Sequence, residues 1–269
     1  MQYDPIKRRL GNLFGKSTLS RRIFYCMLDI LLLRSWHVRR MIRKMAHSLP
    51  ADAAILDAGA GFGQYTRRIA GMNKSWKIDA VDLKEEQVKD CNAFFTRIGL
   101  ADRVTFITGD LTLPGETGKY NLILSVDVME HIVEDSLVFR NFLDALKPDG
   151  TLIISTPSDR GGSGVTHHDD NSFIDEHVRD GYNRDEITQR LRETGFSEVR
   201  ADYTYGLPGS VAWHLAMKYP VKMVNLSGLF WIVLPLYYLI VMPFVLLLNL
   251  ADLHITHRTG TGLIIRAVK

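Results

Sequence analysis

Between residues 53 and 156, short runs of β-branched and other apolar residues alternate with longer segments that place apolar residues three or four positions apart. The short runs have the length of buried strands, and the longer segments have the length and period of helices. Such alternation predicts βαβ units, in which a parallel sheet carries helices on both faces. The predicted strands span 53–57, 77–82, 104–108, 121–125 and 151–156, and the predicted helices span 64–71, 83–98 and 135–146.

The pattern changes after this series, where residues 158–175 are rich in Gly, Ser, His and Asp. This stretch is too polar for a core and long for a connection, so it is a candidate active-site loop. Segments 196–204 and 262–268 then predict two further strands.

A helix is predicted over 184–194, before the first of these two strands. Asn183 and Glu186 have the spacing of a capping box, and Gly195 follows the last helical position. These residues are typical of a helix start and a helix end, respectively.

A long hydrophobic segment separates the two final strands. Residues 223–251 contain no Asp, Glu, Lys or Arg, and 229–248 reach the ~20 apolar residues that cross a bilayer. A single crossing would separate the strands on either side, so the segment must return, and Pro235 and Pro243 offer positions where a helix can bend. We expect a broken, re-entrant or in-plane hydrophobic helix that dips into one leaflet, with a buried dimer interface or a lid as the alternative. Four aromatic residues suit a membrane interface: Phe230, Trp231, Tyr237 and Tyr238.

The positive charge of the chain belongs to its N-terminal arm. Residues 1–50 carry 11 Lys and Arg against 2 Asp and Glu, whereas the remainder carries 22 against 28. In this arm the apolar segments 23–25 and 27–33 are flanked by pairs of basic residues, which favour anionic lipid surfaces. Nucleic-acid binding is the rival explanation, but the apolar content favours a membrane lipid surface as the partner and no nucleic acid.

Cysteine usage and the N-terminus predict the compartment. Cys26 and Cys91 have no metal-ligand spacing, which fits a reducing cytosol. The N-terminus lacks an apolar stretch followed by a cleavage site, so we expect no secretory signal. We therefore expect a peripheral or monotopic protein on the cytoplasmic side of a membrane. Its expected parts are a basic amphipathic helical arm (1–50), an α/β core (51–209), a hydrophobic membrane-associating insert (210–256) and a final core strand (257–269).

A glycine-rich loop follows the first predicted strand. Residues 55–66, ILDAGAGFGQYT, leave a strand and enter a helix, so the glycines allow a tight turn and close approach of a ligand to the backbone. The open helix N-terminus favours the carboxylate of a ligand. The spacing is GxGxG rather than the GxGxxG of dinucleotide sites, which argues against an NAD-dependent oxidoreductase. A nucleotide-free domain with incidental glycines is the other alternative.

Two further acidic positions accompany this loop. Asp82 ends the second predicted strand, where an adjacent sheet position brings a carboxylate to ribose hydroxyls. Asp110 and Leu111 follow the third strand, near where an adenine would lie. In order and spacing, these residues resemble the class I S-adenosylmethionine-dependent methyltransferase superfamily over roughly residues 50–157.

The resemblance implies S-adenosylmethionine as the cofactor. It also implies a Rossmann-like seven-stranded sheet of order 3-2-1-4-5-7-6 whose last strand is antiparallel, with the basic arm before it and the insert between strands 6 and 7. The implied cofactor residues are Asp57, Gly59, Gly61 and Gly63 for the methionine moiety, Asp82 for the ribose, Leu83, Asp110 and Leu111 for the adenine region, and Ser125 on the strand that faces the methyl group.

Acidic and imidazole groups follow the fourth strand. Residues 127–131, DVMEH, resemble the acid-x-x-Glu-His of quinone-pathway O-methyltransferases and small-RNA 2′-O-methyltransferases, where such residues bind a divalent metal. The metal candidates are Asp127, Glu130 and His131, and the further histidine has to come from His167 or its neighbour. Alternatively, Glu130 and His131 shape the pocket and the next helix without a metal, and His131 acts as a general base near neutral pH. We take Asp127 and His131 as catalytic candidates.

A third catalytic candidate precedes the helix at 184–194. Residues 176–182, EHVRDGY, resemble the segment after strand five of many small-molecule methyltransferases, which often borders the acceptor. Arg179 and Tyr182 are therefore candidates for substrate contact. Packing at the helix entry is the alternative.

Methyl transfer from a sulfonium is an in-line displacement, so a site contributes chiefly by orienting the acceptor and removing a proton where one must leave. We expect methyl transfer to an apolar or membrane-derived acceptor: a lipid, a prenylated quinone precursor or a lipid-linked intermediate. The alternatives are an O-methyltransferase of a soluble small molecule or saccharide, anchored by the insert, and a non-catalytic membrane-bound scaffold.

Overall fold

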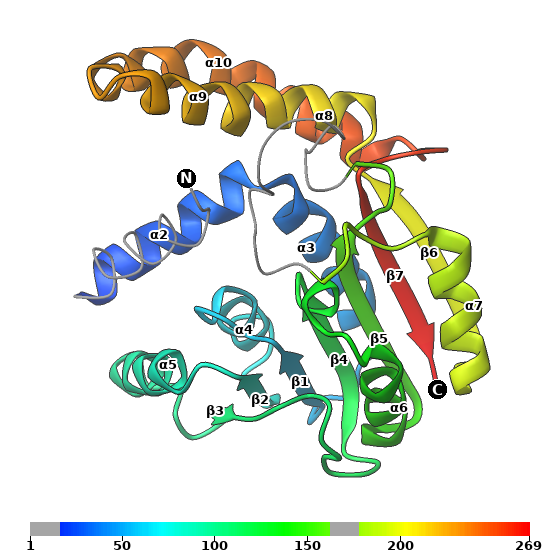
Figure 1. Ribbon diagram of the computed structural model, residues 1–269. Helices are drawn as coiled ribbons and strands as arrows, with labels where there is room; N and C mark the ends of the chain where they lie inside the picture. The colour runs from blue at the N-terminus through cyan, green and yellow to red at the C-terminus, as the bar shows by residue number, and fades with distance from the viewer. Residues whose placement is uncertain (1–16, 162–177) are drawn as a thin grey trace.

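The computed structural model describes residues 17–161 and 178–269 and contains one seven-stranded sheet (Figure 1). The strand order is β3-β2-β1-β4-β5-β7-β6, and β7 runs antiparallel to both of its neighbours. The predicted order and orientation are therefore confirmed. The strands are β1 Ala54–Ala58, β2 Lys77–Asp82, β3 Val104–Thr108, β4 Tyr120–Val126, β5 Leu146–Pro157, β6 Glu198–Thr204 and β7 Gly262–Val268.

Helices cover both faces of the sheet and form two apolar cores. On one face Phe94 and Phe95 of α5 pack with strand residues such as Ile55, and on the other face Phe139 of α6 packs with residues such as Ile123. The central strands are apolar on both faces because both are covered. The core helices are α4 Gln64–Ala70, α5 Glu85–Arg97, α6 Asp135–Ala145 and α7 Arg184–Thr194.

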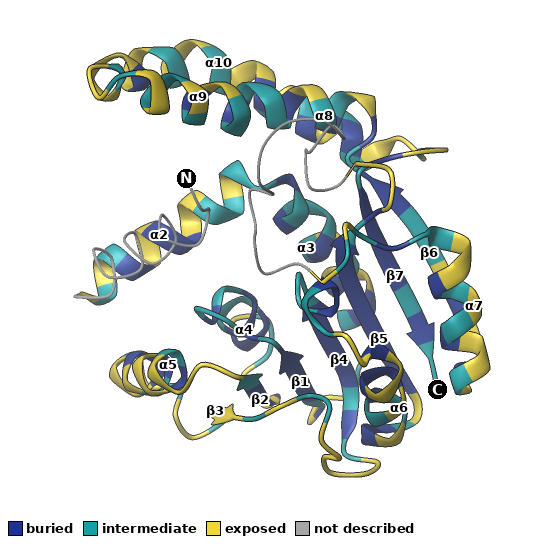
Figure 2. Cartoon of the chain, viewed as in Figure 1, coloured by how far each residue is buried: buried dark blue, intermediate teal, exposed yellow. Residues whose placement is uncertain are grey.

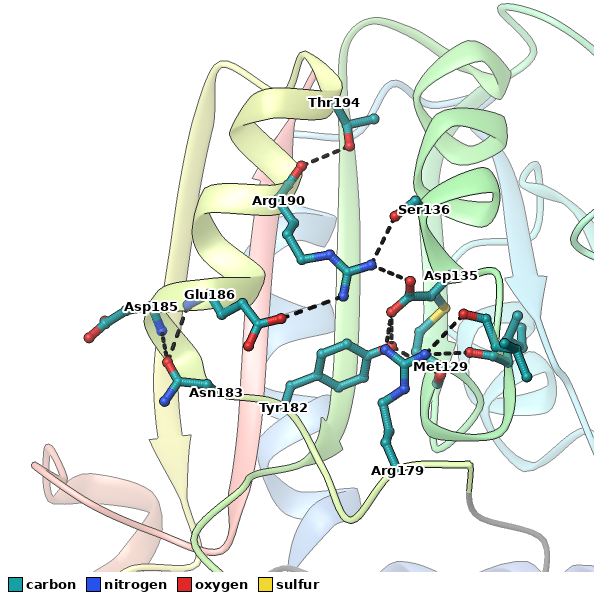
Figure 3. Close-up of polar contacts among 12 residues, drawn as sticks. Met129, Asp135, Ser136, Arg179, Tyr182, Asn183, Asp185, Glu186, Arg190 and Thr194 are labelled. Carbon is teal, nitrogen blue, oxygen red and sulfur yellow. Dashed lines mark hydrogen bonds and ion pairs between the residues drawn. The ribbon is translucent and has the colours of Figure 1, made fainter.

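Helix α7 begins and ends where the sequence predicts. The Asn183 side chain accepts hydrogen bonds from the backbone N–H groups of Asp185 and Glu186, at 3.0 and 3.2 Å (Figure 3). Gly195 follows the helix with φ = 123°, a conformation that glycine adopts without steric cost. Local capping chemistry thus determined both ends of this helix.

The described part of the N-terminal arm consists of two helices that pack on the core. They are α2 Thr18–Leu31 and α3 Leu33–Ala46. Phe24 and Tyr25 of α2 and Val38 and Ile42 of α3 are buried with the residues of the α5 face. Figure 1 shows that α3 starts near the carboxyl ends of β4 and β5 and passes behind these strands. The arm therefore contributes to the edge of the sheet where the glycine loop lies.

The insert between β6 and β7 is a helical hairpin. One arm consists of α8 Leu207–Trp213, a π-helical turn and α9, and the other is α10, a 25-residue helix; the arms run side by side away from the sheet (Figure 1). The chain reverses at residues 227–229, so the segment returns to its starting side as the strand pairing requires. The remaining bounds are His214–Lys218 for the π-helical turn, Tyr219–Leu226 for α9 and Phe230–His254 for α10.

The prediction of a helix broken at its prolines is wrong, because α10 continues through Pro235 and Pro243. A proline inside a helix removes a hydrogen bond and crowds the preceding turn, so other contacts must hold the helix together. The hydroxyls of Tyr237 and Tyr238 donate to the carbonyls of Leu215 and Ala216 in the other arm, at 2.7 and 2.8 Å. These two tyrosines join the arms, and their expected place at a membrane interface stays a prediction.

The hairpin exposes many apolar side chains, and Figure 2 shows exposed positions along α9 and α10. Among the described residues, α10 is the one helix long and apolar enough to cross a membrane by length and composition, and 11% of its most apolar window is buried. Soluble proteins rarely expose large contiguous apolar patches without a partner. The exposed residues include Leu229, Trp231, Ile232, Leu236, Leu239 and Phe244.

We predict that Asn183→Ala lowers the free energy of unfolding by about 1 kcal/mol, because two N–H groups of the first turn of α7 lose their acceptor. Chemical denaturation followed by circular dichroism measures the change. Asn225→Ala, at an exposed position near the end of α9, is the matched control. Equal stability of Asn183→Ala and the wild type would refute the role of this cap.

Candidate functional site

The glycine loop connects β1 to α4 in a backbone conformation that glycine permits. Gly59, Gly61 and Gly63 have φ values of 80°, 53° and 75°. A Cβ atom on Gly59 would lie 2.1 Å from Cγ2 of Val128, so that position also needs glycine for space. A Cβ atom on Gly61 would meet nothing within 4 Å, so the loop is open above this residue.

Asp57 lies beneath this loop at the end of β1. Its side chain is buried and accepts a hydrogen bond from the hydroxyl of Thr66, in the first turns of α4. Burial raises the pKa of Asp57 to about 6, against the lowering effect of this hydrogen bond. The protonation state of a buried carboxyl group with a pKa close to neutrality changes when a cation is placed next to it.

Asp82 joins the end of β2 to the glycine loop. One carboxylate oxygen accepts the N–H of Gly61 at 2.8 Å, and the other accepts the N–H of Lys84 at 3.0 Å. Leu83 is 70% exposed beside it. The residue expected to bind the ribose and the loop expected to bind the methionine moiety are therefore in direct contact.

The residues expected at the adenine region follow β3. Asp110 is exposed and accepts hydrogen bonds from the N–H and the hydroxyl of Thr112, which lower its pKa. Leu111 is half-buried, and its carbonyl accepts a hydrogen bond from the Asn141 side chain of α6. Both residues lie at the carboxyl edge of the sheet, as the predicted cofactor site requires.

Ser125 lies near the end of β4 and pairs in register with Ala58 of β1. Its side chain is completely buried, and its Oγ has no hydrogen-bond partner among the residues that the structure describes. A buried hydroxyl without a partner costs free energy, which a bound polar group would recover.

Helix α2 holds the glycine loop from the other side, which the sequence analysis missed. Arg21 is buried, pairs with Asp90 of α5 and donates to the Phe62 carbonyl at 3.0 Å; the Tyr25 hydroxyl donates to the same carbonyl. Arg21 shares a helix face with Phe24 and Tyr25, and this spacing was the signal that it points inward. It does not contribute to an exposed basic surface.

Asp127 has an arginine as its partner. It follows β4 with φ = 53°, and its carboxylate forms an ion pair with the guanidinium of Arg34 in α3. Glu130 is buried and accepts a hydrogen bond from the hydroxyl of Thr156 at 3.1 Å. Burial raises the pKa of Glu130 above its ordinary value, and the opposing effects of His131 and Arg34 are smaller.

The metal candidates do not form a cluster in the described part of the chain, where no group of three or more His, Cys, Asp or Glu side chains is arranged to hold a metal ion. His167 and His168 lie outside the described residues. His131 ends a short 3₁₀ helix, Met129–His131, directly after β4. It is thus at the carboxyl edge of the sheet, and its role as a general base stays a prediction.

Tyr182 and Arg179 pack against the start of α6. The Tyr182 hydroxyl is buried, 2.7 Å from an Asp135 carboxylate oxygen and 3.0 Å from the Met129 carbonyl (Figure 3). Asp135 also forms ion pairs with Arg179 and Arg190. Burial and the neighbouring carboxylate raise the pKa of Tyr182, which keeps its hydroxyl neutral. These contacts favour packing at the helix entry over substrate contact for both residues.

Comparisons with known proteins agree with this arrangement. Residues 55–150 match the family model described as a methyltransferase domain. Norajmaline N-methyltransferase of Rauvolfia serpentina is 28% identical over 103 residues, 37% of this chain and 34% of that protein. Ubiquinone biosynthesis O-methyltransferase of Xanthomonas axonopodis is 25% identical over 107 residues, 40% of this chain and 44% of that protein. The chain thus spans less than half the length of these relatives.

A solved structure extends the similarity of the fold to most of the chain. Phosphoethanolamine N-methyltransferase 2 of Haemonchus contortus, in complex with S-adenosyl-L-methionine, superposes with a TM-score of 0.60 and 17% identity. The superposition covers 97% of this chain and 59% of that one. At this identity the similarity establishes the fold alone.

The raised pKa of Asp57 predicts a pH-dependent stability. Between pH 4 and pH 6 the unfolded chain releases the Asp57 proton, whereas the folded chain keeps it, so folding loses stability as pH rises through this range. The loss amounts to about 3 kcal/mol and is complete above the folded pKa. Chemical denaturation at several pH values measures this effect. The free energy of unfolding of Asp57→Asn should rise relative to that of the wild type as the pH increases from 4 to 6.

Asp102→Asn, at an exposed position between α5 and β3, is the matched control and should follow the wild-type profile. A constant difference between Asp57→Asn and the wild type from pH 4 to pH 8 would contradict the raised pKa.

Proposed function

Because residues 55–150 belong to the class I S-adenosylmethionine-dependent methyltransferase superfamily, we propose that this protein methylates an apolar acceptor drawn from a membrane. The observation that carries the proposal is the exposed apolar hairpin inserted between β6 and β7 of a methyltransferase sheet. The similarity to a ubiquinone biosynthesis O-methyltransferase supports an acceptor of this class.

The residues at the carboxyl edge fit S-adenosylmethionine. The buried Ser125 hydroxyl lacks a partner within residues 17–161 and 178–269, and the loop is open above Gly61. The raised pKa of Asp57 reflects the cost of a buried negative charge, which a neighbouring ammonium group would compensate. Asp57 and the loop would hold the methionine moiety, and Asp82 the ribose hydroxyls. When bound, the cofactor supplies a methyl group on a sulfonium, which a nucleophile displaces in line.

On the acceptor side, the protein contributes orientation and a place for a proton. His131 would take the proton of a hydroxyl acceptor, since a neutral imidazole nitrogen accepts a proton without a metal. Asp127 would face the acceptor from the end of β4. An acceptor that already carries a nucleophilic lone pair would need the orientation alone.

The hairpin and α2 would bind the bilayer together. Helix α2 exposes an apolar stripe at helical spacing, and Figure 2 shows exposed positions on this helix beside buried ones. Each large apolar side chain removed from water contributes about 1.5–3 kcal/mol when fully buried, so partial insertion of both surfaces is enough for stable binding. The arrangement suits a peripheral or monotopic protein on the cytoplasmic side. The stripe of α2 consists of Leu19, Ile23, Met27 and Ile30.

One prediction of the proposed function concerns the cofactor. Asp82→Ala should weaken S-adenosylmethionine binding by about 10- to 100-fold, because the ribose hydroxyls lose a charged acceptor. Titration calorimetry measures the dissociation constant, and Asp102→Ala at an exposed loop position is the control. Equal binding by Asp82→Ala and the wild type would contradict the role of Asp82. No binding by either would argue against a catalytic methyltransferase and for a scaffold.

Another prediction of the proposed function concerns the membrane. A triple variant, Leu229→Ser, Trp231→Ser and Ile232→Ser, changes side chains that are 73%, 65% and 79% exposed, so the fold should persist. Its binding to vesicles of phosphatidylcholine with phosphatidylglycerol, measured by sedimentation, should fall about tenfold or more.

The control for this triple variant changes exposed apolar residues near α6, Val133→Ser with Leu137→Ser, and should bind vesicles like the wild type. Equal loss in both variants, or no loss in the triple variant, would refute the hairpin as the membrane contact.

Mass spectrometry identifies the acceptor. Lipid extracts of cells with and without the protein should differ by a species that is heavier by one methylene when the protein is present. An unchanged lipid extract, together with a methylated water-soluble metabolite, would support the soluble-acceptor alternative and overturn the membrane-derived acceptor.

A further inference from the structure

Arg34 contacts the acidic residue at the end of β4. It lies in the first turn of α3, and its guanidinium pairs with the Asp127 carboxylate; the two side chains are 23% and 26% exposed. The Asp127 N–H donates to the Ser155 carbonyl of β5 at 2.9 Å. The carboxylate is therefore held between two strand ends and one helix.

The same arginine contacts a second residue with an unusual backbone. The Arg34 N–H donates to the Tyr205 hydroxyl at 2.9 Å. Asp127 and Tyr205 have φ values of 53° and 55°, and Asp149 is the third non-glycine residue with positive φ in the described ranges. Such conformations persist where the surrounding contacts impose them, and they concentrate at functional sites. Arg34 thus connects two of the three such positions.

A buried carboxylate at the base of the hairpin holds this arrangement. Asp252 of α10 is fully buried and accepts the Tyr205 N–H at 3.2 Å and the Gly209 N–H at 2.9 Å. It also contacts Nε2 of His37 at 2.9 Å, one turn beyond Arg34 in α3. The end of α10 and the start of α3 therefore share one set of polar contacts.

We propose that Arg34 is a positioning residue for methyl transfer, which holds the Asp127 carboxylate toward the acceptor, and that Asp252 fixes Arg34 in place from the hairpin base. This inference rests on the proposed methyl transfer. It assigns a role to contacts that join the hairpin to the end of β4, 125 residues away in sequence.

A double-mutant cycle tests the action of Arg34 through Asp127. Methyl transfer is followed with S-adenosylmethionine carrying a tritiated methyl group and with mixed micelles of a total lipid extract. Arg34→Ala should lower kcat about 10- to 100-fold while the dissociation constant of S-adenosylmethionine changes by less than about twofold. Arg34→Lys should restore part of the rate, and the double variant Arg34→Ala, Asp127→Ala should be no slower than Asp127→Ala.

Arg97→Ala is the control, because Arg97 is exposed on α5 and contacts a carbonyl of its own helix. The positioning role would be overturned if the double variant lost kcat by the product of the two single losses. It would also be overturned if Arg34→Ala lost cofactor affinity while its kcat stayed unchanged. Faster turnover of Arg34→Ala would also overturn it, because the ion pair would then block the acceptor.

Hydrogen exchange tests the arrangement without an acceptor. With S-adenosylhomocysteine present, exchange in peptides spanning 124–132 should increase in Arg34→Ala, in Asp252→Asn and in His37→Gln, but not in Arg97→Ala. Unchanged exchange in the first three variants would overturn the inference. If the wild type transfers no methyl group to the extract, the proposed function fails, and hydrogen exchange still decides whether Arg34 and Asp252 hold the end of β4.

Discussion

The pairing of β7 between β5 and β6 constrains every segment around the site. Gly262 pairs with Pro157 on one side and with Thr204 on the other, so β5 and β6 end at the edge where β7 begins. The insert must therefore leave and rejoin the sheet at this edge. The glycine loop and Asp127 also lie there, because parallel strands bring their carboxyl ends together. An apolar hairpin at this point in the sequence is thus next to the catalytic edge by topology alone.

Two buried charged residues connect the segments that meet at this edge of the sheet. Arg21 and Asp252 are almost completely buried, and a buried charge is tolerated when hydrogen bonds and opposite charges compensate for lost hydration. Arg21 satisfies this requirement with groups of α5 and the glycine loop, and Asp252 with groups of α3, α8 and the end of β6. Segments far apart in sequence are therefore held together by polar contacts in addition to apolar packing.

Much of the fold could be predicted because its determinants are local. Residues 77–82, 104–108 and 262–268 were predicted as strands with their observed bounds, and helix 184–194 was predicted from its caps. Strand β5 was predicted too short: the expected strand covers 151–156, whereas β5 starts at Leu146 and includes Asp149 at φ = 61°. The strand periodicity is clear where both faces are buried and is lost at the exposed start of β5.

The contacts that assemble the site from distant segments could not be predicted. Nothing near Arg34 in the sequence indicates Asp127 as its partner, and nothing near Tyr237 indicates a carbonyl of the opposite arm. The prolines of α10 were misjudged for the same reason, since local propensity disfavours them inside a helix while contacts between the arms hold the helix straight. Sequence patterns report the preference of each segment, and here tertiary hydrogen bonds override it.

Helix α2 connects the proposed membrane surface with the proposed cofactor site. Its inner face holds the Phe62 carbonyl of the glycine loop through Arg21 and Tyr25, and its outer face presents the apolar stripe that includes Ile23 and Met27. A helix is rigid over this length, so a force that orients the outer face also orients the inner one. Binding of the stripe to a bilayer would therefore stabilise the conformation in which the loop is held, and, by thermodynamic linkage, cofactor binding would strengthen membrane binding by the same factor.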